Sequence, residues 1–495
     1  MQKPTKVKEI PSLPEDEESK EQKTKKEKQR KQIDEKTSVL ERNVNGTTAC
    51  LFEEEATTRV REIETLSVKQ KKRTETTTKM VRKPETPKDD RSTPVTPRTA
   101  APKNSRKTPA CAEGEEGKTE SELKKMNDEH EVNTILTKTL SSLTIRMDDR
   151  SQAAEVINQI TKSIVDHLKT NSVSFQTVEK PLCTGSYYEK VKISSPDEFD
   201  VMIPIPLERV NLTEFGDNGA FYSVALKRGA TSLAKFQEKG TLRASLMLKE
   251  FREEVKKCVK NFKEWEVEKK KPGCPAVTLT TRVQSILISL DVVLCIMVRT
   301  SWPLFTNDGL KIQKWLGAKV RQNFRREPFY LVPKYEGRST VEKDGVQAKD
   351  VWRISFSHVE KAMLMNHGSE KTCCEKAGSP CCRKNCLKLL KHLLSLLKDE
   401  DKSFEKFCSY HAKTTLFHLC CSRSKDAHWS SEDLPHCFQQ LLEHFEEHLE
   451  AGVLPNFFIP SQNLLSGPGT NACKKLAARV REERQQGFPK LRSQL

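Results

Sequence analysis

The stretch Gly185-Ser186-Tyr187-Tyr188-Glu189, followed by Glu198-Phe199-Asp200-Val201-Met202, decides the fold that the sequence predicts. The second segment begins a strand expected over Glu198 to Ile203. Alternate side chains of a strand share a face, so Glu198 and Asp200 project together. Two carboxylates on one face can bind a divalent cation. The small pair Gly185-Ser186 lets backbone amides approach an anion closely, with the serine hydroxyl as a further donor.

A third acid interrupts a long apolar run. Asp291 lies within Ile286-Leu-Ile-Ser-Leu-Asp-Val-Val-Leu294, in a strand predicted over Ser285 to Cys295. An isolated carboxylate among branched aliphatic side chains is costly to bury, so Asp291 requires a metal ion or a paired donor. Three acids from two strands can hold two Mg²⁺ ions about 4 Å apart, which is the arrangement of nucleotidyl transfer. Each motif alone is common on exposed strands and in loops, and only their combination is specific.

Together these segments resemble the cyclic GMP-AMP synthase family of polymerase-β-like (Mab-21-like) nucleotidyltransferases, over about residues 135 to 495. The resemblance implies an enzyme that double-stranded DNA activates and that joins ATP and GTP by a 2′-5′ bond and then a 3′-5′ bond. It implies two Mg²⁺ ions, with Mn²⁺ as a substitute, a role in innate immunity and antiviral defence, and a location in cytosol and nucleus. We expect Glu198 and Asp200 to anchor the ions and Asp291 to assist deprotonation of the attacking hydroxyl.

The periodicity of the rest of the chain predicts an α+β protein with two lobes after a tail. We expect a disordered basic tail over 1–130, a long helix and the nucleotidyltransferase sheet lobe over 131–300, and the remainder of the sheet with a helical lobe over 301–495. Apolar residues from Ile135 to Leu168 recur at helical spacing, as one long helix or two in series. Further helices are predicted over 245–268, 309–325, 357–367, 384–398, 403–420 and 432–451, and further strands over 220–226, 276–283 and 329–333.

The tail is rich in Lys, Glu, Thr, Arg and Pro, and it cannot bury enough apolar surface to offset its ordering entropy. The whole chain has 86 Lys and Arg against 69 Asp and Glu, a net charge of +17, which favours a polyanionic partner. Charge alone does not choose between nucleic acid, chromatin and an anionic membrane surface. The start of the chain lacks the apolar core of a signal peptide, and Ile286 to Val298 is too short to span a bilayer. We therefore expect a soluble intracellular protein with no transmembrane segment.

A cysteine cluster lies near the end of the helix predicted from Ser357. His367, Cys373, Cys374 and Cys381 fall within fifteen residues, and four such donors can surround one structural Zn²⁺ tetrahedrally. The resemblance implies a zinc thumb over 367–386 with these four ligands. Spacing alone leaves Cys382 open in place of Cys381, and the alternative to a metal site is a set of reduced thiols.

A basic stripe follows the cysteines. Lys384, Lys388 and Lys391 fall at i, i+4 and i+7 on one face of a predicted helix whose other face is leucine-rich. Such a stripe is more often simply solvated, but a metal knuckle beside it would fix it against a duplex. No base-reading motif is apparent, so DNA binding should involve phosphates, be independent of sequence and depend on salt. The resemblance implies a homodimer on DNA with contacts at Lys361, Lys384 and Lys388, and we add their neighbour Arg383.

The segment Ser409-Tyr410-His-Ala-Lys413 combines an aromatic face with a cation one turn away, which suits base stacking and phosphate binding. From the residues alone, a core tyrosine is the simpler interpretation. The resemblance implies that Tyr410 stacks a base and that Arg353 contacts the other nucleotide. It places further residues near phosphates: Gly185, Ser186, Lys391, Ser409 and Lys413. It also makes 203–219 an activation loop that DNA rearranges, although Pro204 and Pro206 are expected to interrupt the strand there.

Other classes of function stay open on the sequence. A related transferase making linear oligonucleotides would use the same acids. A catalytically inactive Mab-21-like scaffold would bind DNA without chemistry, and a chromatin-binding protein with a vestigial domain would explain the basic tail. Neither non-enzyme requires a charged Asp291 inside an apolar strand, so the three acids favour the enzyme.

Overall fold

The structure is a computed structural model that describes residues 120–227, 232–370, 373–374 and 380–495, with side chains from Asp128 onward. The predicted tail lies outside the described residues as far as residue 119. Residues 120–130, which were predicted to belong to the tail, are described and are helical, since helix α2 (Glu120–Ser142) begins before the expected boundary at residue 130. Within the described residues, no helix has the length and apolar character needed to cross a bilayer.

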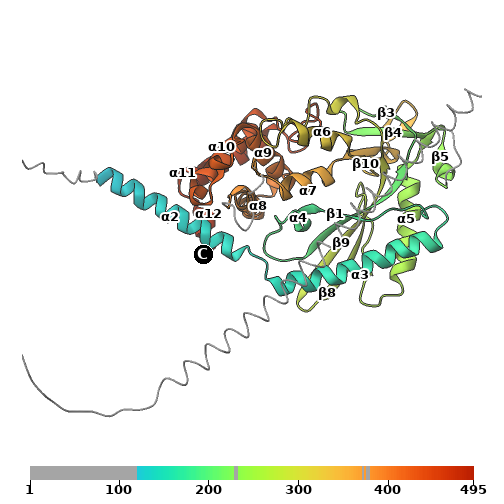
Figure 1. The fold of residues 1–495 in the computed structure, drawn as a ribbon, viewed down its shortest axis with the longest axis horizontal. Helices are drawn as coiled ribbons and strands as arrows, with labels where there is room; N and C mark the ends of the chain where they lie inside the picture. Colours follow the sequence, from blue (N-terminus) through green and yellow to red (C-terminus); the bar gives the residue numbers. More distant parts are fainter. Residues whose placement is uncertain (1–119, 228–231, 371–372, 375–379) are drawn as a thin grey trace, which may run out of the picture. The chain divides into compact units, whose positions relative to one another are not determined.

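One mixed sheet organises the first lobe (Figure 1). Its strands follow the order β1-β2-β9-β10-β13-β4-β3, and β8 pairs with both β9 and β7. β2 and β9 run parallel to each other, whereas the other pairs of this sheet are antiparallel. The strands are β1 (Leu182–Thr184), β2 (Glu198–Leu207), β3 (Val210–Glu214), β4 (Phe221–Leu226), β7 (Glu266–Val267), β8 (Ala276–Val283), β9 (Ile286–Val298), β10 (Phe329–Val332) and β13 (Trp352–Ser355). Two short hairpins form separate two-stranded sheets: β5 (Gln237–Glu238) with β6 (Thr241–Leu242), and β11 (Glu342–Lys343) with β12 (Val346–Gln347).

β2 continues through Pro204 and Pro206, so the prediction that these prolines interrupt the strand is wrong. They pair in register with Cys295 and Met297 of β9. In a parallel pair, the backbone groups of alternate residues point to opposite sides of the strand. The carbonyl of Pro204 accepts a hydrogen bond from the N–H of Glu179 (2.9 Å), which is not part of β9. The missing proline N–H groups therefore face an edge that β1 does not cover, where proline is tolerated.

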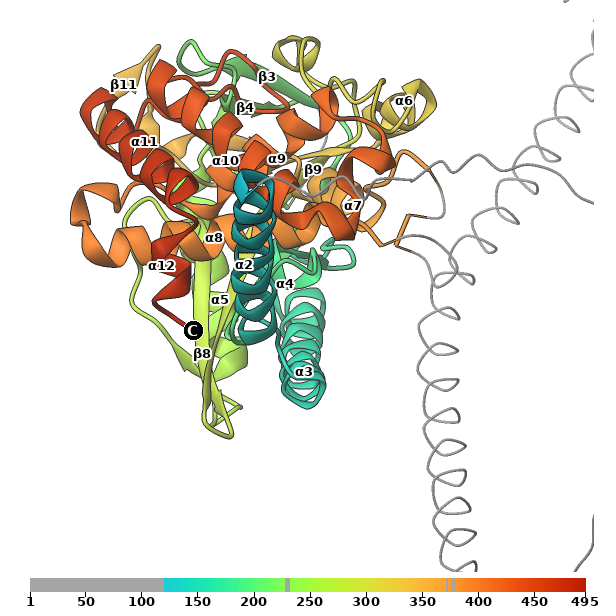
Figure 2. The same ribbon diagram turned by 90° about the vertical axis from the view of Figure 1, so that its left-hand side faces the viewer.

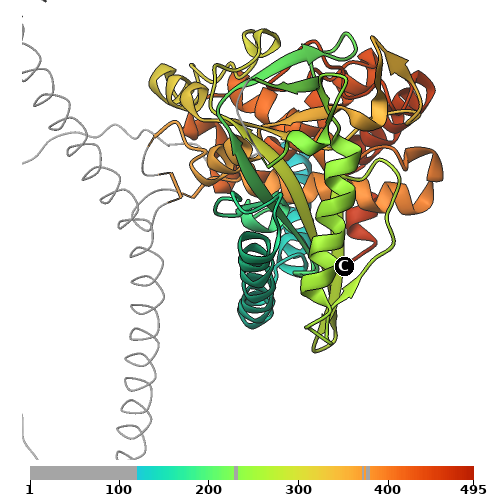
Figure 3. The same ribbon diagram turned by 90° about the vertical axis from the view of Figure 1, so that its right-hand side faces the viewer.

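Two helices pack in the sheet lobe, and both are visible in Figure 3. α3 (Met147–Asn171) contacts α5 (Ala244–Val259) and β2. α5 ends before its predicted end at Glu268, because the chain turns into β7, which pairs with β8. The shorter helices are α4 (Gly185–Tyr188), α6 (Ala318–Arg326), which starts later than predicted, and α7 (Ser357–Met365).

The second lobe is helical and contains α8 (Arg383–Glu400), α9 (Ser409–Ser422), α10 (Leu434–Ala451), α11 (Thr470–Gln485) and α12 (Pro489–Arg492). α11 was not predicted, since only scattered small and apolar residues mark its buried face. α2 contacts α8, α10 and α12 of this lobe (Figure 2). The long amphipathic segment is therefore two helices that serve different lobes, α2 the helical lobe and α3 the sheet. The predicted two-lobed α+β class is confirmed.

Candidate active site

Asp200 and Asp291 lie side by side across the parallel strands β2 and β9, where they are direct partners in register. The Oδ1 of Asp291 accepts a hydrogen bond from the hydroxyl of Thr278 on β8 (2.6 Å), which orients that carboxylate. Burial and the charges of Asp291 and Glu198 raise the pKa of Asp200 to about 6. Carboxylates held together against their repulsion suit a divalent cation, whose charge would favour the ionised form. The residues present therefore fit Mg²⁺ at this position.

Gly185 begins helix α4 directly against the Asp200 carboxylate. Its φ of +79° lies in the left-handed region, and a Cβ there would be 1.9 Å from Oδ2 of Asp200. Position 185 therefore requires glycine for two reasons, the backbone conformation and the lack of space for a Cβ atom. The backbone at Gly185 and Ser186 can thus approach an anion bound beside Asp200.

Glu198 does not converge with the other two acids. Its side chain is 72% exposed and forms an ion pair with Lys192 (2.6 Å), whose Nζ also contacts Asp197 (2.7 Å). Burial lowers the pKa of Lys192, but the bonds to these two carboxylates outweigh burial and raise it. Among the described residues, only a His and Cys cluster elsewhere gathers three or more ligand atoms tightly enough for one metal ion. The structure thus brings two of the three predicted acids together.

A buried ion network lies near Asp200 and includes two of the residues predicted to bind nucleotide. Lys413 Nζ contacts Glu189 (2.8 Å) and Glu360 (2.6 Å), and the Tyr410 hydroxyl donates to Glu360 (3.1 Å). Burial lowers the pKa of Lys413, but the two carboxylates outweigh it and hold the pKa above its usual range.

Sequence reasoning missed the two glutamates of this network. Glu360 lies in the first turn of α7, where it faces Tyr410 and Lys413. Glu189 is 2% exposed. Its position directly after Gly185-Ser186-Tyr187-Tyr188 is the one sequence signal that marks it.

Tyr410 and Arg353 line one cavity of about 450 Å³, a size typical of small-molecule sites. Arg353 and burial lower the pKa of Lys334, which lines the same cavity, so two cations share it. The other polar side chains around it are Glu336, Ser355, Ser357, Glu360, Cys408, His411, Asn456 and Gln462. Ser409 and Lys391 do not line it. Ser409 is exposed at the start of α9, and Lys391 donates to the carbonyl of Val191 (2.8 Å).

The thumb cluster, His367, Cys373, Cys374 and Cys381, places four ligand atoms within 4.8 Å of one another. This resolves the choice between Cys381 and Cys382, since Cys382 is fully buried outside the group. His367 Nδ1 hydrogen-bonds the carbonyl of Leu364 (2.9 Å), which leaves Nε2 for a metal. Burial lowers the pKa of His367 to about 4, so the imidazole is neutral, as a ligand must be. The donor set fits tetrahedral Zn²⁺.

The basic stripe on α8 is only partly exposed and faces further cations. Burial and Lys190 lower the pKa of Lys384 to about 8, and burial and Lys192 lower that of Lys391 to about 8. Burial and Arg150 lower the pKa of Lys388 as well. Lysines whose pKa values are lowered by burial and by neighbouring cations lie in a region of positive potential, which favours an anionic ligand.

Two other residues predicted to bind DNA lie in different settings. Lys361 donates to the carbonyl of Cys183 (2.9 Å) and lies over the ring of Tyr188, 5.4 Å from its centre. Arg383 does not fit the prediction, because its side chain is 1% exposed and pairs with Asp426 (2.8 Å) behind the thumb cluster. Arg383 therefore braces the thumb from within and is not available to an external ligand.

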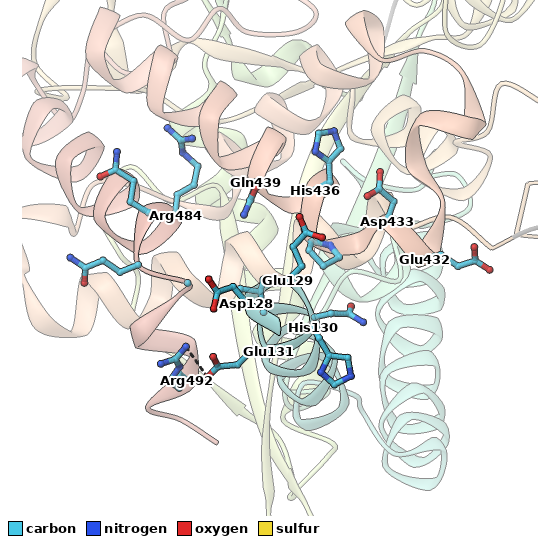
Figure 4. A pocket seen from close by; sticks show the side chains of 16 residues that line it. Asp128, Glu129, His130, Glu131, Glu432, Asp433, His436, Gln439, Arg484 and Arg492 are labelled. Carbon is cyan, nitrogen blue, oxygen red and sulfur yellow. Dashed lines mark ion pairs between the residues drawn. The ribbon is translucent and has the colours of Figure 1, made fainter. Parts of the chain in front are cut away.

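A second cavity, of about 1040 Å³, lies away from these residues (Figure 4). It is lined mainly by α2 and α10 and by the turn between α11 and α12. Acidic side chains such as Glu129 and Asp433 alternate there with His130, His436 and Arg484. None of its lining residues belongs to the acids, the thumb cluster or the basic stripe, so size alone does not identify the active site.

The sheet with its acid pair, the Gly-Ser turn against it and the zinc-type cluster between two lobes define a nucleotidyltransferase of the Mab-21 type. The Mab-21 protein nucleotidyltransferase domain matches residues 187–366, and the Mab-21 protein HhH/H2TH-like domain matches residues 382–482. The chain belongs to the cyclic GMP-AMP synthase family.

Three relatives show how far the similarity extends. The cyclic GMP-AMP synthase of Mus musculus is 45% identical over 361 residues, 72% of this chain and 70% of that protein. That of Sus scrofa is 43% identical over 357 residues, 71% of each chain. The cyclic GMP-AMP synthase-like receptor of Magallana gigas is 26% identical over 335 residues, 64% of this chain and 52% of that protein.

Replacing Gly185 with alanine should inactivate the site without unfolding the protein. The methyl group would displace the Asp200 carboxylate and strain a backbone with positive φ. We expect nucleotidyl transfer to fall by at least about tenfold, since a displacement of about 1 Å can cost on the order of a hundredfold. Product formation measures the effect. Gly467→Ala is the matched control, because a Cβ there has nothing within 4 Å; equal losses in both variants would contradict the assignment.

Proposed function

We propose that this chain synthesises cyclic GMP-AMP from ATP and GTP when double-stranded DNA is bound, by a 2′-5′ and then a 3′-5′ linkage, as an innate immune DNA sensor. The observation that carries the proposal is the pairing of Asp200 with Asp291 in register on parallel strands, with Gly185 packed against Asp200. The family relationship supports the identity of the substrates and product, because the two mammalian relatives bear the name of this synthase.

In this proposal the acids hold two Mg²⁺ ions, or Mn²⁺, which supply Lewis-acid stabilisation of the charge that develops during transfer. Asp291 is oriented for its task by Thr278, which occupies Oδ1 and leaves Oδ2 for the site. We propose that Asp291 assists the removal of the proton from the attacking hydroxyl. Asp200 lies nearest the Gly185-Ser186 turn, whose backbone and hydroxyl donors bind the triphosphate.

The cavity lined by Tyr410 and Arg353 is the proposed nucleotide pocket. Tyr410 offers its ring for stacking, and its hydroxyl is tied to Glu360, which fixes the ring. Lys413, between two buried carboxylates, is already charge-compensated. We therefore assign it the positioning of Tyr410 and of the acids as well as contact with phosphate. Ser409 and Lys391, outside the cavity, are assigned to the phosphate end of the substrate.

The proposed DNA surface consists of Lys384 and Lys388 on α8, with Lys361 nearby. The lowered pKa values of Lys384 and Lys388, caused first by burial and then by nearby cations, support it, because a duplex phosphate would restore the charged form that burial disfavours. Binding is to the phosphate backbone, without preference for sequence. We propose that Zn²⁺ in the thumb cluster holds this surface rigid and that two chains assemble on DNA. We also assign the basic first 119 residues to chromatin or anionic membrane contacts, and the chain to cytosol and nucleus.

Activation by DNA is supported by the position of Glu198. Lys192 pairs with the carboxylate of Glu198, which does not join Asp200 and Asp291 at one metal position among the described residues. Lys192 lies one residue after Val191, whose carbonyl accepts from Lys391 of the basic stripe. A phosphate bound at the stripe therefore reaches the segment that restrains Glu198. We propose that DNA releases the ion pair and that Glu198 then completes the metal site.

A double change, Glu198→Ala with Asp200→Ala, tests the chemistry. Product should fall by on the order of a thousandfold or more, because bound metal ions supply several kcal/mol of transition-state stabilisation. DNA binding should not be lost, since neither acid belongs to the DNA surface. The measurement is product mass from ATP, GTP and Mg²⁺, with and without duplex. Linear products from the unaltered chain would favour an oligonucleotide transferase, and retained synthesis by the variant would refute the assignment of the acids.

The DNA surface is tested by Lys384→Ala with Lys388→Ala. Loss of two phosphate contacts should weaken duplex binding for every sequence and reduce the magnitude of the slope of log K against log salt by about 2. Titration with labelled duplexes at several salt concentrations measures both. Lys474→Ala, an exposed lysine of α11, serves as the control. An unchanged slope in the double variant would move the DNA surface elsewhere.

Lys192→Met removes the charge that holds Glu198 while keeping a side chain of similar length. Synthesis without DNA should rise by roughly fivefold, because an ion pair with one exposed partner is worth at most about 1 kcal/mol. Initial rates with and without duplex measure the change. A fall of both rates together would show that Lys192 serves the chemistry itself, and restraint of Glu198 would have to come from another contact.

A further inference from the structure

Three histidines of the helical lobe lie in a chain of ring contacts far in sequence from the predicted ligands. His444 and His448 are one turn apart on α10, with ring centres 4.7 Å apart. His418 of α9 lies 5.7 Å from the ring of His448. The ring of Phe457 packs on His418 at 5.3 Å, so the group lies against an aromatic wall.

One nitrogen of each α10 imidazole is fixed by an acceptor. The Nδ1 of His448 lies 2.9 Å from the carbonyl of Val453, and a carbonyl only accepts, so Nδ1 carries the hydrogen. The Nδ1 of His444 lies 3.1 Å from a carboxylate oxygen of Glu447, which likewise accepts. In the neutral form of either ring the lone pair is therefore on Nε2.

Both Nε2 atoms are buried, and neither has a hydrogen-bond partner among the described residues. A buried acceptor without a partner is costly, and it requires an explanation such as an ion or a water molecule. His448 does not become protonated at neutral pH, because burial lowers its pKa to about 4. The two lone pairs therefore remain available to a Lewis acid.

We propose that His444 and His448 form a second metal site, which binds a divalent first-row transition ion of the Zn²⁺ class through the two Nε2 atoms. Histidines at i and i+4 share one helix face, so one ion can reach both rings. A carboxylate or carbonyl on the far nitrogen is the usual second partner of a metal-bound imidazole. Water completes the coordination, so the site is open where the thumb cluster is closed.

The site is independent of the proposed synthase activity. It shares no residue with the acids, the nucleotide cavity, the basic stripe or the thumb cluster. Imidazole ligands suit Zn²⁺, Co²⁺, Ni²⁺ and Cu²⁺, whereas Mg²⁺ prefers oxygen, so the two kinds of metal partition between this site and the active site. With two protein ligands, this site should bind Zn²⁺ more weakly than the four-ligand thumb.

The test measures how many zinc ions the full-length chain binds. Free Zn²⁺ is buffered at a concentration higher than the one that saturates the thumb cluster. Elemental analysis should find one ion more per chain in the unaltered protein than in the variant His444→Gln with His448→Gln. His436→Gln, an exposed histidine of the same helix, is the matched control and should keep the extra ion. If the double variant fails to fold, His444→Gln alone serves, since this side chain is 27% exposed.

Cobalt identifies which site is occupied. Co²⁺ in the thumb has thiolate ligands and gives sulfur-to-metal charge-transfer absorption, whereas Co²⁺ between two imidazoles does not. Added Co²⁺ should thus bind in a second phase without this absorption, and that phase should vanish in the double variant. Glu447→Gln should weaken the second phase by roughly 10- to 100-fold, as loss of an outer partner does. Equal ion counts in the unaltered protein and the double variant, or equal loss in His436→Gln, would overturn the proposal.

Discussion

Two negative charges placed side by side by the pairing of parallel strands are the constraint on which the active site depends. Folding alone does not favour this arrangement, since burial and mutual repulsion raise the pKa of Asp200. The surroundings compensate in part: Thr278 donates to Asp291, and the positive charge of Lys413 lies close enough to lower the pKa of Asp200. The repulsion between the two carboxylates that these contacts leave uncompensated makes the pair suited to bind a cation. The repulsion that a bound cation would relieve therefore contributes to the metal affinity of the site.

The thumb and the two lobes form a connected frame around this pair. α7 leads from the sheet to His367, and α8 begins directly after Cys382 and carries the basic stripe. Arg383 joins the parts from within, because it pairs with Asp426 and lies over the ring of Trp429. A metal ion in the thumb cluster would therefore fix the direction in which α8 leaves the thumb, and with it the position of three lysines relative to the segment before Glu198.

The sequence predicted the chemistry better than the geometry. Period-2 alternation placed Glu198 and Asp200 on one face, and the charge inside an apolar run marked Asp291. Ligand spacing found the thumb. The prediction for Arg383 failed because it depends on a partner distant in the chain: its position after the cysteines suggests a surface cation, whereas in the fold it pairs with Asp426. Glu360 was missed for the same reason, since only the fold brings Lys413 to it. Pro204 and Pro206 were misjudged because tolerance for proline depends on which strand edge is free, which no local pattern contains.

The attachment of Lys391 to the carbonyl of Val191 has a thermodynamic consequence. Lys391 lies on the same helix as Lys384 and Lys388 of the surface proposed for the duplex, and it connects this helix to the chain segment proposed to restrain Glu198. In that proposal, nucleic acid and metal-bound nucleotide act on one shared equilibrium. Linkage is reciprocal for binding free energies: whatever factor the duplex contributes to substrate affinity, the substrate returns to duplex affinity. A chain engaged with both nucleotides should therefore leave DNA more slowly than an idle one, and residence on the duplex becomes a function of cellular ATP and GTP.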